Sequence, residues 1–254
     1  MRNLIITFVL LGSSLVVLTL FVGVTKIQTV PLFSSVHPHL YDATSTSIGK
    51  IRLTVFYFIP KDALSKKEDS WKEITEPHLK KLLEFHNLQL RGTSEITYDF
   101  SPTVIIGNKN SKEYESLFEH DDHQSLVPVE EEIKSRVFER SGDLYIPKKE
   151  DTSTYQVYLI VFEGNGAAGN DTFSLISRSY LTDPLYKEDS STFLAHEFYH
   201  TLGLPDNYKA AAYVYKDNQQ TNVSILTKKD IMGQVNIPLQ YSYIDAESLK
   251  HLGF

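Results

Sequence analysis

The sequence predicts a mixed α/β (α+β) domain with a twisted sheet, preceded by an apolar N-terminal transmembrane helix. Three observations support this prediction: an uncharged apolar stretch at residues 4–24, strand-like runs that alternate with amphipathic helical segments, and an ordinary globular composition. The stretch at 4–24 is long enough to cross a bilayer as a helix. Arg2 precedes it, so we expect an exported domain, either membrane-anchored or, after signal-peptide cleavage, secreted.

The composition excludes several classes of site. The formal net charge is −7, which argues against a nucleic-acid binder because such proteins normally carry a basic face. The chain has no cysteine, which excludes disulfides, thiolate metal sites and a cysteine nucleophile. Any metal must therefore be bound by histidine or carboxylate side chains.

The chain divides into three segments by composition. Residues 1–24 contain the membrane anchor or signal peptide, residues 25–50 form a linker rich in Ser, Thr and Pro, and residues 51–254 form the domain. His37 and His39 flank Pro38 in the linker, and we interpret them as part of an extended chain rather than as metal ligands.

The first half of the domain predicts strands around two helices. Residues 51–59 are β-branched and aromatic and predict a buried strand, and residues 95–100 and 103–106 predict two shorter strands. The first helix has Ser70 as a candidate cap and an inward stripe formed by Leu79, Leu82, Leu83 and His86. We expect His86 to be a packed core histidine. A second helix is expected at 127–140, with these residues facing inward: Val129, Ile133, Val137 and Phe138.

The region before the third helix reads as strand, turn and strand. Residues 155–163 predict the strongest strand, residues 164–169 a glycine-rich turn, and residues 172–177 a further strand, which we expect to lie at the sheet edge. The cluster at 120–123 (HDDH) is interpreted as an acidic loop because no third anchor is visible. Asn170 and Asn222 begin glycosylation sequons.

The segment 196–200 (HEFYH) carries the strongest chemical signal. Ser190 or Ser191 can cap a helix that runs through it to residue 202. Histidines four residues apart lie on one helical face, so His196 and His200 can bind one ion. Glu197 lies beside the first histidine and points toward the same cavity, near a metal-activated water. The pattern predicts a catalytic metal site.

A catalytic zinc needs a third protein ligand and an open fourth position. Gly203 can adopt a left-handed conformation that ends the helix and turns the chain. That turn can bring Asp206 back toward the ion as an oxygen ligand. In this composition, a chance H-E-x-x-H is expected only about 0.02 times per chain, so the motif is a specific signal.

The same residues resemble the metzincin zinc signature in its aspartate-ended form, H-E-x-x-H-x-x-G-x-x-D. The run 202–208 (LGLPDNY) is similar to snapalysin and to the immune-inhibitor-A-like peptidases. Residues 230–233 (DIMG) resemble the Met-turn, with Met232 beneath the zinc ligands, and residues 243–253 resemble the closing helix, with Asp245 as its cap. The resemblance covers about 190–254. It implies a metzincin-like zincin domain with a mixed sheet, an active-site helix, a Met-turn and a C-terminal helix.

Two positions depart from the metzincin pattern. Tyr199 stands where many members have a small residue before the second histidine. Gln234 stands where some members place a tyrosine that assists the transition state. Tyr208, Tyr241 and Tyr243 are candidates for that role, and a structural role is the alternative for each.

The expected chemistry is hydrolysis of a peptide bond in a protein or peptide substrate. His196, His200 and Asp206 would hold Zn²⁺, and Glu197 would act as the general base toward a zinc-activated water. One rival is a gluzincin-type site with a different third ligand, for which Glu247 is the only glutamate after the motif. The other is a membrane-tethered binding domain with a structural zinc, although a structural site has no use for a base at position 197.

Overall fold

The computed structural model describes residues 36–115, 122–138, 153–186, 188–207, 212–216, 219–223 and 229–254. Within it, His37–Phe254 forms one compact unit. The predicted membrane helix at 4–24 and the side chains of the acidic segment 120–123 lie outside the described residues. Among the residues described, no helix is both long and apolar enough to cross a membrane.

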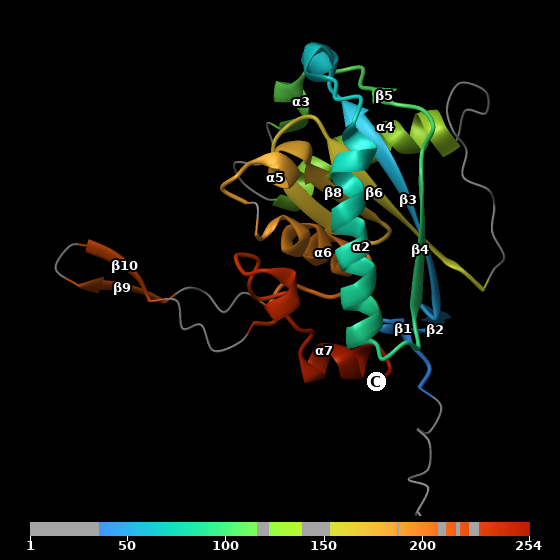
Figure 1. Cartoon of the computed structure of the whole chain (residues 1–254), viewed down its shortest axis with the longest axis vertical. Helices are drawn as coiled ribbons and strands as arrows, with labels where there is room; N and C mark the ends of the chain where they lie inside the picture. Colours follow the sequence, from blue (N-terminus) through green and yellow to red (C-terminus); the bar gives the residue numbers. More distant parts are fainter. Residues whose placement is uncertain are drawn as a thin grey trace, which may run out of the picture. The chain divides into compact units, whose positions relative to one another are not determined.

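A mostly parallel sheet of six strands forms the centre of the domain (Figure 1), as the predicted mixed α/β class requires. Its order is β4–β3–β6–β8–β7, and β5 pairs with the end of β3 beyond β4. Only β7 runs antiparallel to its neighbour. The strand bounds are β3 Lys50–Ile59, β4 Glu95–Phe100, β5 Ile105–Ile106, β6 Tyr155–Phe162, β7 Ala167–Asn170 and β8 Phe173–Ser177.

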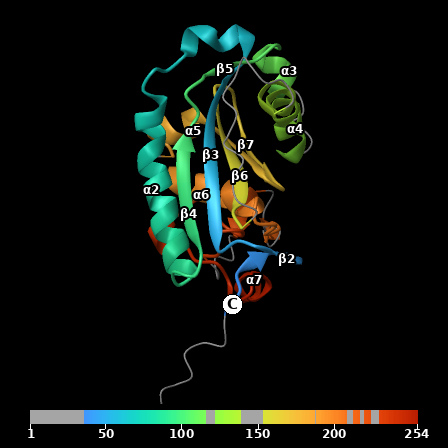
Figure 2. The ribbon, with the colours of Figure 1, turned by 90° about the vertical axis from the view of Figure 1, so that its right-hand side faces the viewer.

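Helices cover both faces of this sheet (Figure 2). One face, here called the site face, packs against α2 (Trp71–Gln89), α5 (Arg178–Thr182) and α6 (Ser190–His200). The opposite face packs against α3 (Ser111–Glu115) and α4 (Asp122–Ile133). Side chains of β3 alternate between the two cores, as the two-residue period of a strand requires. Two shorter helical segments lie among these elements, η1 (Lys61–Lys66) and the π-helical η2 (Lys134–Phe138), which continues α4.

The predicted helices agree with the structure in their buried stripes. On α2, Leu79, Leu82 and His86 are buried, and Leu83 is partly buried. Ser70 occupies the N-cap position, but its side chain makes no capping hydrogen bond; its hydroxyl instead donates to Glu68 Oε1. On α4 and η2, the inward side chains predicted at 129, 133 and 137 are buried, and the side chain at 138 lies outside the description.

The predicted sheet edge was wrong. Residues 172–177 were expected to form the edge, but β8 lies between β6 and β7. The edge strand is β7, which begins inside the predicted glycine-rich turn at 164–169. The turn itself is shorter than expected, and Ala167, Ala168 and Gly169 then form a short strand. Such small residues carry no strand signal in the sequence, and pairing with β8 decides their conformation.

The compact unit also begins earlier than the predicted boundary at residue 51. The hairpin of β1 (His39–Leu40) and β2 (Ala43–Ser47) lies within the predicted linker, and β3 follows directly. The amide of His39 donates to Leu252 O, which ties this hairpin to the C-terminal end of the domain. Tertiary hydrogen bonds, rather than local periodicity, order these Ser/Thr-rich residues.

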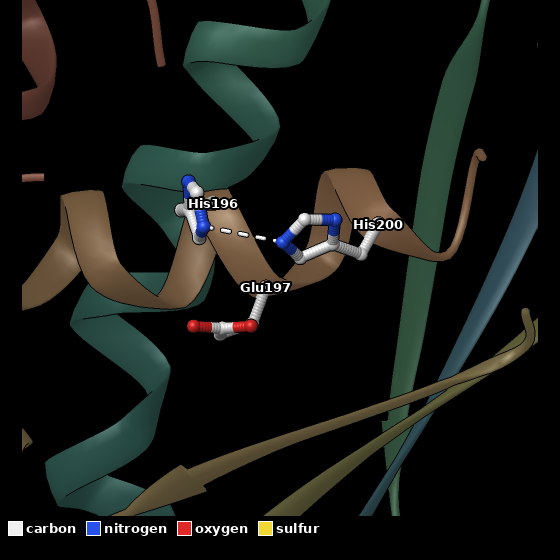
Figure 3. Close-up of side chains that lie close together, drawn as sticks. All are labelled: His196, Glu197 and His200. Carbon is white, nitrogen blue, oxygen red and sulfur yellow. Dashed lines mark hydrogen bonds between the residues drawn. The ribbon is translucent and has the colours of Figure 1, made fainter. Parts of the chain in front are cut away.

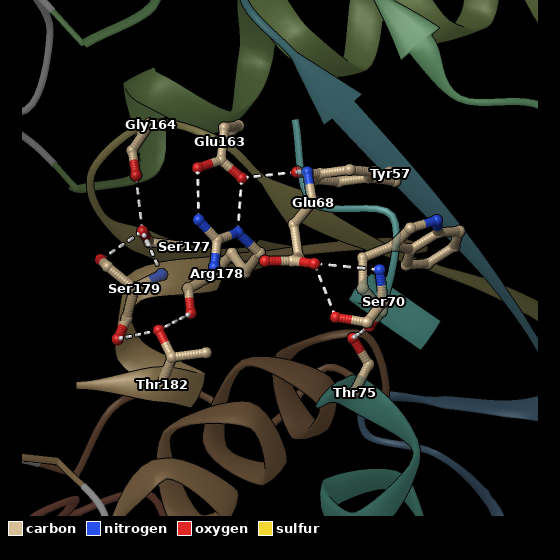
Figure 4. A network of polar contacts seen from close by, with 11 residues as sticks. Tyr57, Glu68, Ser70, Thr75, Glu163, Gly164, Ser177, Arg178, Ser179 and Thr182 are labelled. Atoms are coloured by element: carbon tan, nitrogen blue, oxygen red, sulfur yellow. Dashed lines mark hydrogen bonds and ion pairs between the residues drawn. The ribbon is translucent and has the colours of Figure 1, made fainter. Parts of the chain in front are cut away.

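A buried polar network joins β3, β6 and α5 (Figure 4). Arg178 forms two hydrogen bonds to Glu163, at 2.6 and 2.8 Å, and the Tyr57 hydroxyl donates to the same carboxylate at 2.6 Å. Burial and this hydrogen bond raise the pKa of Tyr57 to about 12. Because Glu163 is almost fully buried, its charge needs these partners. The network fixes the start of the segment that leads to α6.

The C-terminal part follows α6. A hairpin of β9 (Ala212–Lys216) and β10 (Gln219–Val223) is followed by η3 (Leu239–Tyr241) and α7 (Ala246–His251). The predicted cap of α7 is confirmed, because the Asp245 carboxylate accepts the amide of Ser248 at 2.7 Å.

Candidate metal centre

The helix α6 is buried along almost its whole length. Of its eleven residues, only Phe193 is not buried. Ser190 and Ser191 were expected to cap it, but they are its first residues and Asp189 occupies the N-cap position. The Ser190 hydroxyl donates to Tyr186 O at 2.6 Å, and Ser191 Oγ lies 2.8 Å from Nδ1 of His78. Contacts with neighbouring segments therefore hold the start of the helix.

Three side-chain atoms of the predicted ligands converge at the other end of α6. The Nε2 atoms of His196 and His200 lie 3.2 Å apart, and Figure 3 shows the two rings on one side of the helix. Oδ1 of Asp206 lies 3.2 Å from the first Nε2 and 3.4 Å from the second. The three predicted ligands thus form a compact triangle of one oxygen and two nitrogens.

The turn that returns Asp206 to the histidines depends on Gly203. Gly203 has φ of +84°, in the left-handed region that was predicted to end the helix. Its amide donates to His200 O at 2.9 Å, and the amide of Leu204 donates to Tyr199 O at 3.3 Å. These bonds reverse the chain within one turn, so a residue six positions after His200 can reach the ligand face.

The backbone holds both imidazoles in one tautomer. Nδ1 of His196 lies 2.9 Å from Ile231 O, and Nδ1 of His200 lies 2.8 Å from Leu204 O. Because a carbonyl can only accept, each Nδ1 carries the hydrogen and each Nε2 presents its lone pair. Two lone pairs and a carboxylate oxygen repel one another at these distances unless a proton or a cation lies among them.

The triangle fits a tetrahedral metal ion. For metal bonds of about 2.0–2.1 Å, tetrahedral ligands lie about 3.3–3.4 Å from one another. The observed separations of 3.2, 3.2 and 3.4 Å are close to this value. Histidine Nδ1–H bonds to backbone carbonyls are also the usual means of orienting metal-binding imidazoles. The donor set of two nitrogens and one oxygen suits zinc among other divalent ions.

The electrostatics of the site favour positive charge at the His196 imidazole. Burial alone would lower the pKa of His196, but the Asp206 carboxylate and the nearby Glu197 raise it above its ordinary value. Partial burial would likewise raise the pKa of Asp206, whereas its contacts with the two histidines hold it well below the usual range. The site therefore stabilises a carboxylate anion beside a cation, as a metal site must.

Glu197 is buried and its carboxylate lies near the histidine pair (Figure 3). One of its carboxylate oxygens and one ligand nitrogen of each histidine all lie within 4.8 Å of one another. The structure thus places a second carboxylate, that of Glu197, beside the triangle formed by His196, His200 and Asp206. Glu247, the rival ligand, is exposed in the first turn of α7.

The segment that resembles the Met-turn contacts the site through its backbone. Met232 is fully buried, its carbonyl accepts the amide of Asn207 at 2.8 Å, and the preceding Ile231 carbonyl accepts His196 Nδ1. The buried Asp230 accepts hydrogen bonds from the Asn207 side chain and from the amide of Asp245. This segment therefore links the residue after Asp206 with the start of α7.

Two residues that shape the candidate site were not identified from the sequence. A Cβ atom on Gly169 would overlap the backbone oxygen of Glu197 and lie 2.8 Å from Cβ of His200, so only glycine lets β7 approach α6 there. Asp230 was noted only as part of a motif. The glycine-rich run at 164–169 was a usable signal for close backbone approach, whereas nothing local marks Asp230 as a tertiary link.

The candidate tyrosines have different surroundings. Tyr241 is exposed, with Nζ of Lys229 5.5 Å from its ring centroid, and Tyr243 pairs through its backbone with Asp230. Tyr208 lies outside the described residues. His39 lies in β1, and its Nδ1 contacts Leu40 O at 2.8 Å.

No known protein family matches this chain, and no curated protein is significantly similar to it in sequence.

Proposed function

We propose that this protein is a zinc-dependent endopeptidase of the metzincin type, in which His196, His200 and Asp206 hold the metal. The observation that carries the proposal is the triangle of Nε2, Nε2 and Oδ1 atoms, with both histidines held in the ligand tautomer. A structural zinc site is normally closed by four protein ligands and has no use for a catalytic base, whereas here the buried Glu197 lies beside three candidate ligands.

The sheet topology supports the finer assignment of the fold. The antiparallel edge strand β7, the helix α6 packed beside it, the buried Met232 turn and the closing helix α7 occur in the order expected of a metzincin-like domain. The likeness is one of architecture and motif.

A bound zinc supplies Lewis-acid chemistry: it lowers the pKa of a water and polarises the scissile carbonyl. Glu197 takes the proton from the attacking water and delivers it to the leaving amine. Its burial excludes bulk water from the carboxylate, and its position on the same helix as both histidines keeps it at a constant distance from them. The Nδ1 hydrogen bonds orient the imidazoles throughout the reaction.

The substrate would bind as an extended peptide along β7. This strand is the sheet edge, so one side of its backbone is not paired within the sheet, and an extended peptide can add to it by main-chain hydrogen bonds. Gly169 brings this strand against Glu197 and His200. A peptide on β7 would therefore pass the proposed catalytic base.

Three proteins test the proposal: the wild type, Glu197→Gln and His200→Ala. We expect about one zinc per wild-type chain by metal analysis, full zinc in Glu197→Gln and loss of most zinc in His200→Ala. Hydrolysis of casein or of a peptide library should fall at least about 10²-fold in Glu197→Gln. Wild-type hydrolysis by that variant would contradict the mechanism, and full zinc in His200→Ala would contradict the ligand assignment.

The third ligand needs its own test. Asp206→Ala should weaken zinc binding severely and Asp206→His should partly restore it, because zinc accepts nitrogen or oxygen at this position. Glu247→Ala is the matched control and should leave zinc binding unchanged. The opposite pattern would indicate the gluzincin-type arrangement.

We also propose that this activity lies outside the cytoplasm, because residues 4–24 form an uncharged apolar segment after Arg2. A protease added to intact cells should then release the domain, while a fragment with residues 4–24 stays in the membrane fraction. Full-length protein in the soluble cytosol would contradict this location.

A further inference from the structure

The N-terminal strap, defined here as residues 37–47, contacts the turn that carries Asp206. The amide of Tyr41 donates to Leu202 O at 3.0 Å. A Cβ atom on Gly203 would lie 3.1 Å from Cβ of Tyr41, so the strap packs directly on the left-handed residue of the turn. The strap is far from the proposed zinc motif in the sequence, yet it contacts the turn at Gly203 that leads to Asp206.

The strap is itself held by the C-terminal end of the domain. The rings of Tyr41 and His251 stack with centroids 4.4 Å apart and planes inclined by 24°. His39 donates its amide to Leu252 O at 3.1 Å, and the amide of Ile48 donates to Pro38 O at 3.0 Å. Tyr41 is therefore clamped between α7 and the turn.

These contacts bind the carbonyls directly after the end of α6, those of Thr201 and Leu202. The last carbonyls of a helix have no partner within the helix, so the groups that bind them fix the direction in which the chain leaves. Here the Tyr155 hydroxyl donates to Thr201 O at 2.8 Å, and the Tyr41 amide donates to the next carbonyl. The chain then reaches Asp206 through Gly203, the residue with the greatest backbone freedom.

We infer that Tyr41 is a positioning residue for Asp206: the strap seats the turn so that the Asp206 carboxylate meets both histidines. This inference rests on the proposed zinc site. A metal ligand must be held within about 0.5 Å of its productive position, and groups that support a ligand are worth about 10–100-fold in metal affinity. Tyr41 acts through its ring and its backbone amide, so phenylalanine should replace it.

The experiment compares Tyr41→Ala, Tyr41→Phe and Tyr98→Ala in the full-length protein. Tyr98 is a matched control because it is also a partly buried tyrosine, yet it belongs to β4 at the far edge of the sheet and donates to Glu76. Zinc affinity is measured by competition with a chelator. Hydrogen exchange of the amides at 202–207 is measured in the metal-free protein.

Tyr41→Ala should weaken zinc binding at least about 10-fold and speed exchange at 202–207, while Tyr41→Phe and Tyr98→Ala change neither beyond about twofold. Wild-type affinity in Tyr41→Ala, or an equal loss in Tyr98→Ala, would overturn the inference while the zinc site stands. If the wild type binds no zinc, the proposed function fails, and the exchange data then decide alone whether Tyr41 holds the turn.

Discussion

The two faces of the central sheet bury different kinds of side chain. The buried side chains of the opposite face are mostly aromatic and aliphatic, such as Phe56, Phe58 and Phe162, and α4 also buries Glu130, which pairs with Lys134. The site face buries polar groups as well, and those on α2 and α6 include His86, Ser191, His196, Glu197 and His200. Both faces belong to the same strands, so the difference comes from the helices.

This difference separates stability from function. A buried polar group costs free energy unless it is fully hydrogen-bonded, so a fold gains nothing in stability from placing many of them in one core. On the site face, the buried His86 of α2 makes specific contacts with Tyr199 and Ser94. We infer that the opposite face mainly stabilises the sheet, whereas some of the buried groups of the site face orient α6.

The largest effect on stability is expected from the opposite face. The Phe58 ring packs edge-on against Tyr114, with centroids 5.2 Å apart, and is fully buried. Phe58→Ala should lower the free energy of unfolding by about 3–5 kcal/mol. Urea unfolding in the presence of a chelator measures this loss. The zinc content of the folded fraction should stay at the wild-type level, and a specific loss of zinc would break the proposed division between the faces.

A smaller cost in stability with a larger cost in function is expected at Gly169. Its substitution by alanine forces β7 away from α6, and overpacking of this kind costs about 1–3 kcal/mol. Because the displaced backbone is that of Glu197, zinc affinity and peptidase activity should fall further than stability. Gly49→Ala is the matched control, since the nearest atom to its added Cβ is at an ordinary 3.4 Å. Equal effects of the two variants would contradict the role of Gly169.

The site face should also make stability depend on pH through His86. Burial lowers the pKa of His86 from 6.5 to about 3, so the folded state keeps it neutral while the unfolded state takes up a proton below pH 6.5. Neutral His86 therefore makes its full contribution to the free energy of unfolding above pH 6.5. As the pH falls from 6.5 toward 3, this contribution decreases by about 1.4 kcal/mol per pH unit. In metal-free protein, His86→Gln should make the free energy of unfolding less dependent on pH between pH 6.5 and 4. An unchanged slope would exclude His86 as the source.

The smallest effect is expected at Ser191, a buried polar residue of the site face that lies at the start of α6, outside the metal triangle. Ser191→Ala removes its contact with His78 and should cost about 0.5–1.5 kcal/mol in stability. Zinc affinity, measured by chelator competition, should not change. A drop in affinity would show that the start of α6 also controls the positions of its histidines.

Much of the sheet could be predicted because its strands carry a strong local pattern. The strand at 95–100 has the bounds of β4, and the strand at 155–163 differs from β6 by one residue. The convergence of His196 and His200 was also predictable, because helical geometry alone places residues four apart on one face. Gly203 adds a conformation that glycine adopts at low cost, which is again a local property.

The rest depends on tertiary contacts that leave no local pattern. The strand β7 consists of two alanines, a glycine and an asparagine, and its pairing with β8 determines its conformation. The strap at 37–47 has the composition of a linker, and tertiary contacts such as its hydrogen bonds to Leu202 and Leu252 order it. Gly169 serves the site through a backbone approach between two elements, which no single segment of the sequence can indicate.

The parallel pairing of β3 with β6 has a consequence for how the chain folds. Their network joins Tyr57 to Glu163, 106 positions apart, so the centre of the sheet cannot close until residues up to 163 have been synthesised. Pairings of such high contact order fold slowly, because the entropy of closing a long loop is lost before the contacts form. Until then, the apolar β3 is exposed, and nascent chains that end before residue 155 should be cleaved by a protease within β3, whereas chains that extend past the network should be protected there.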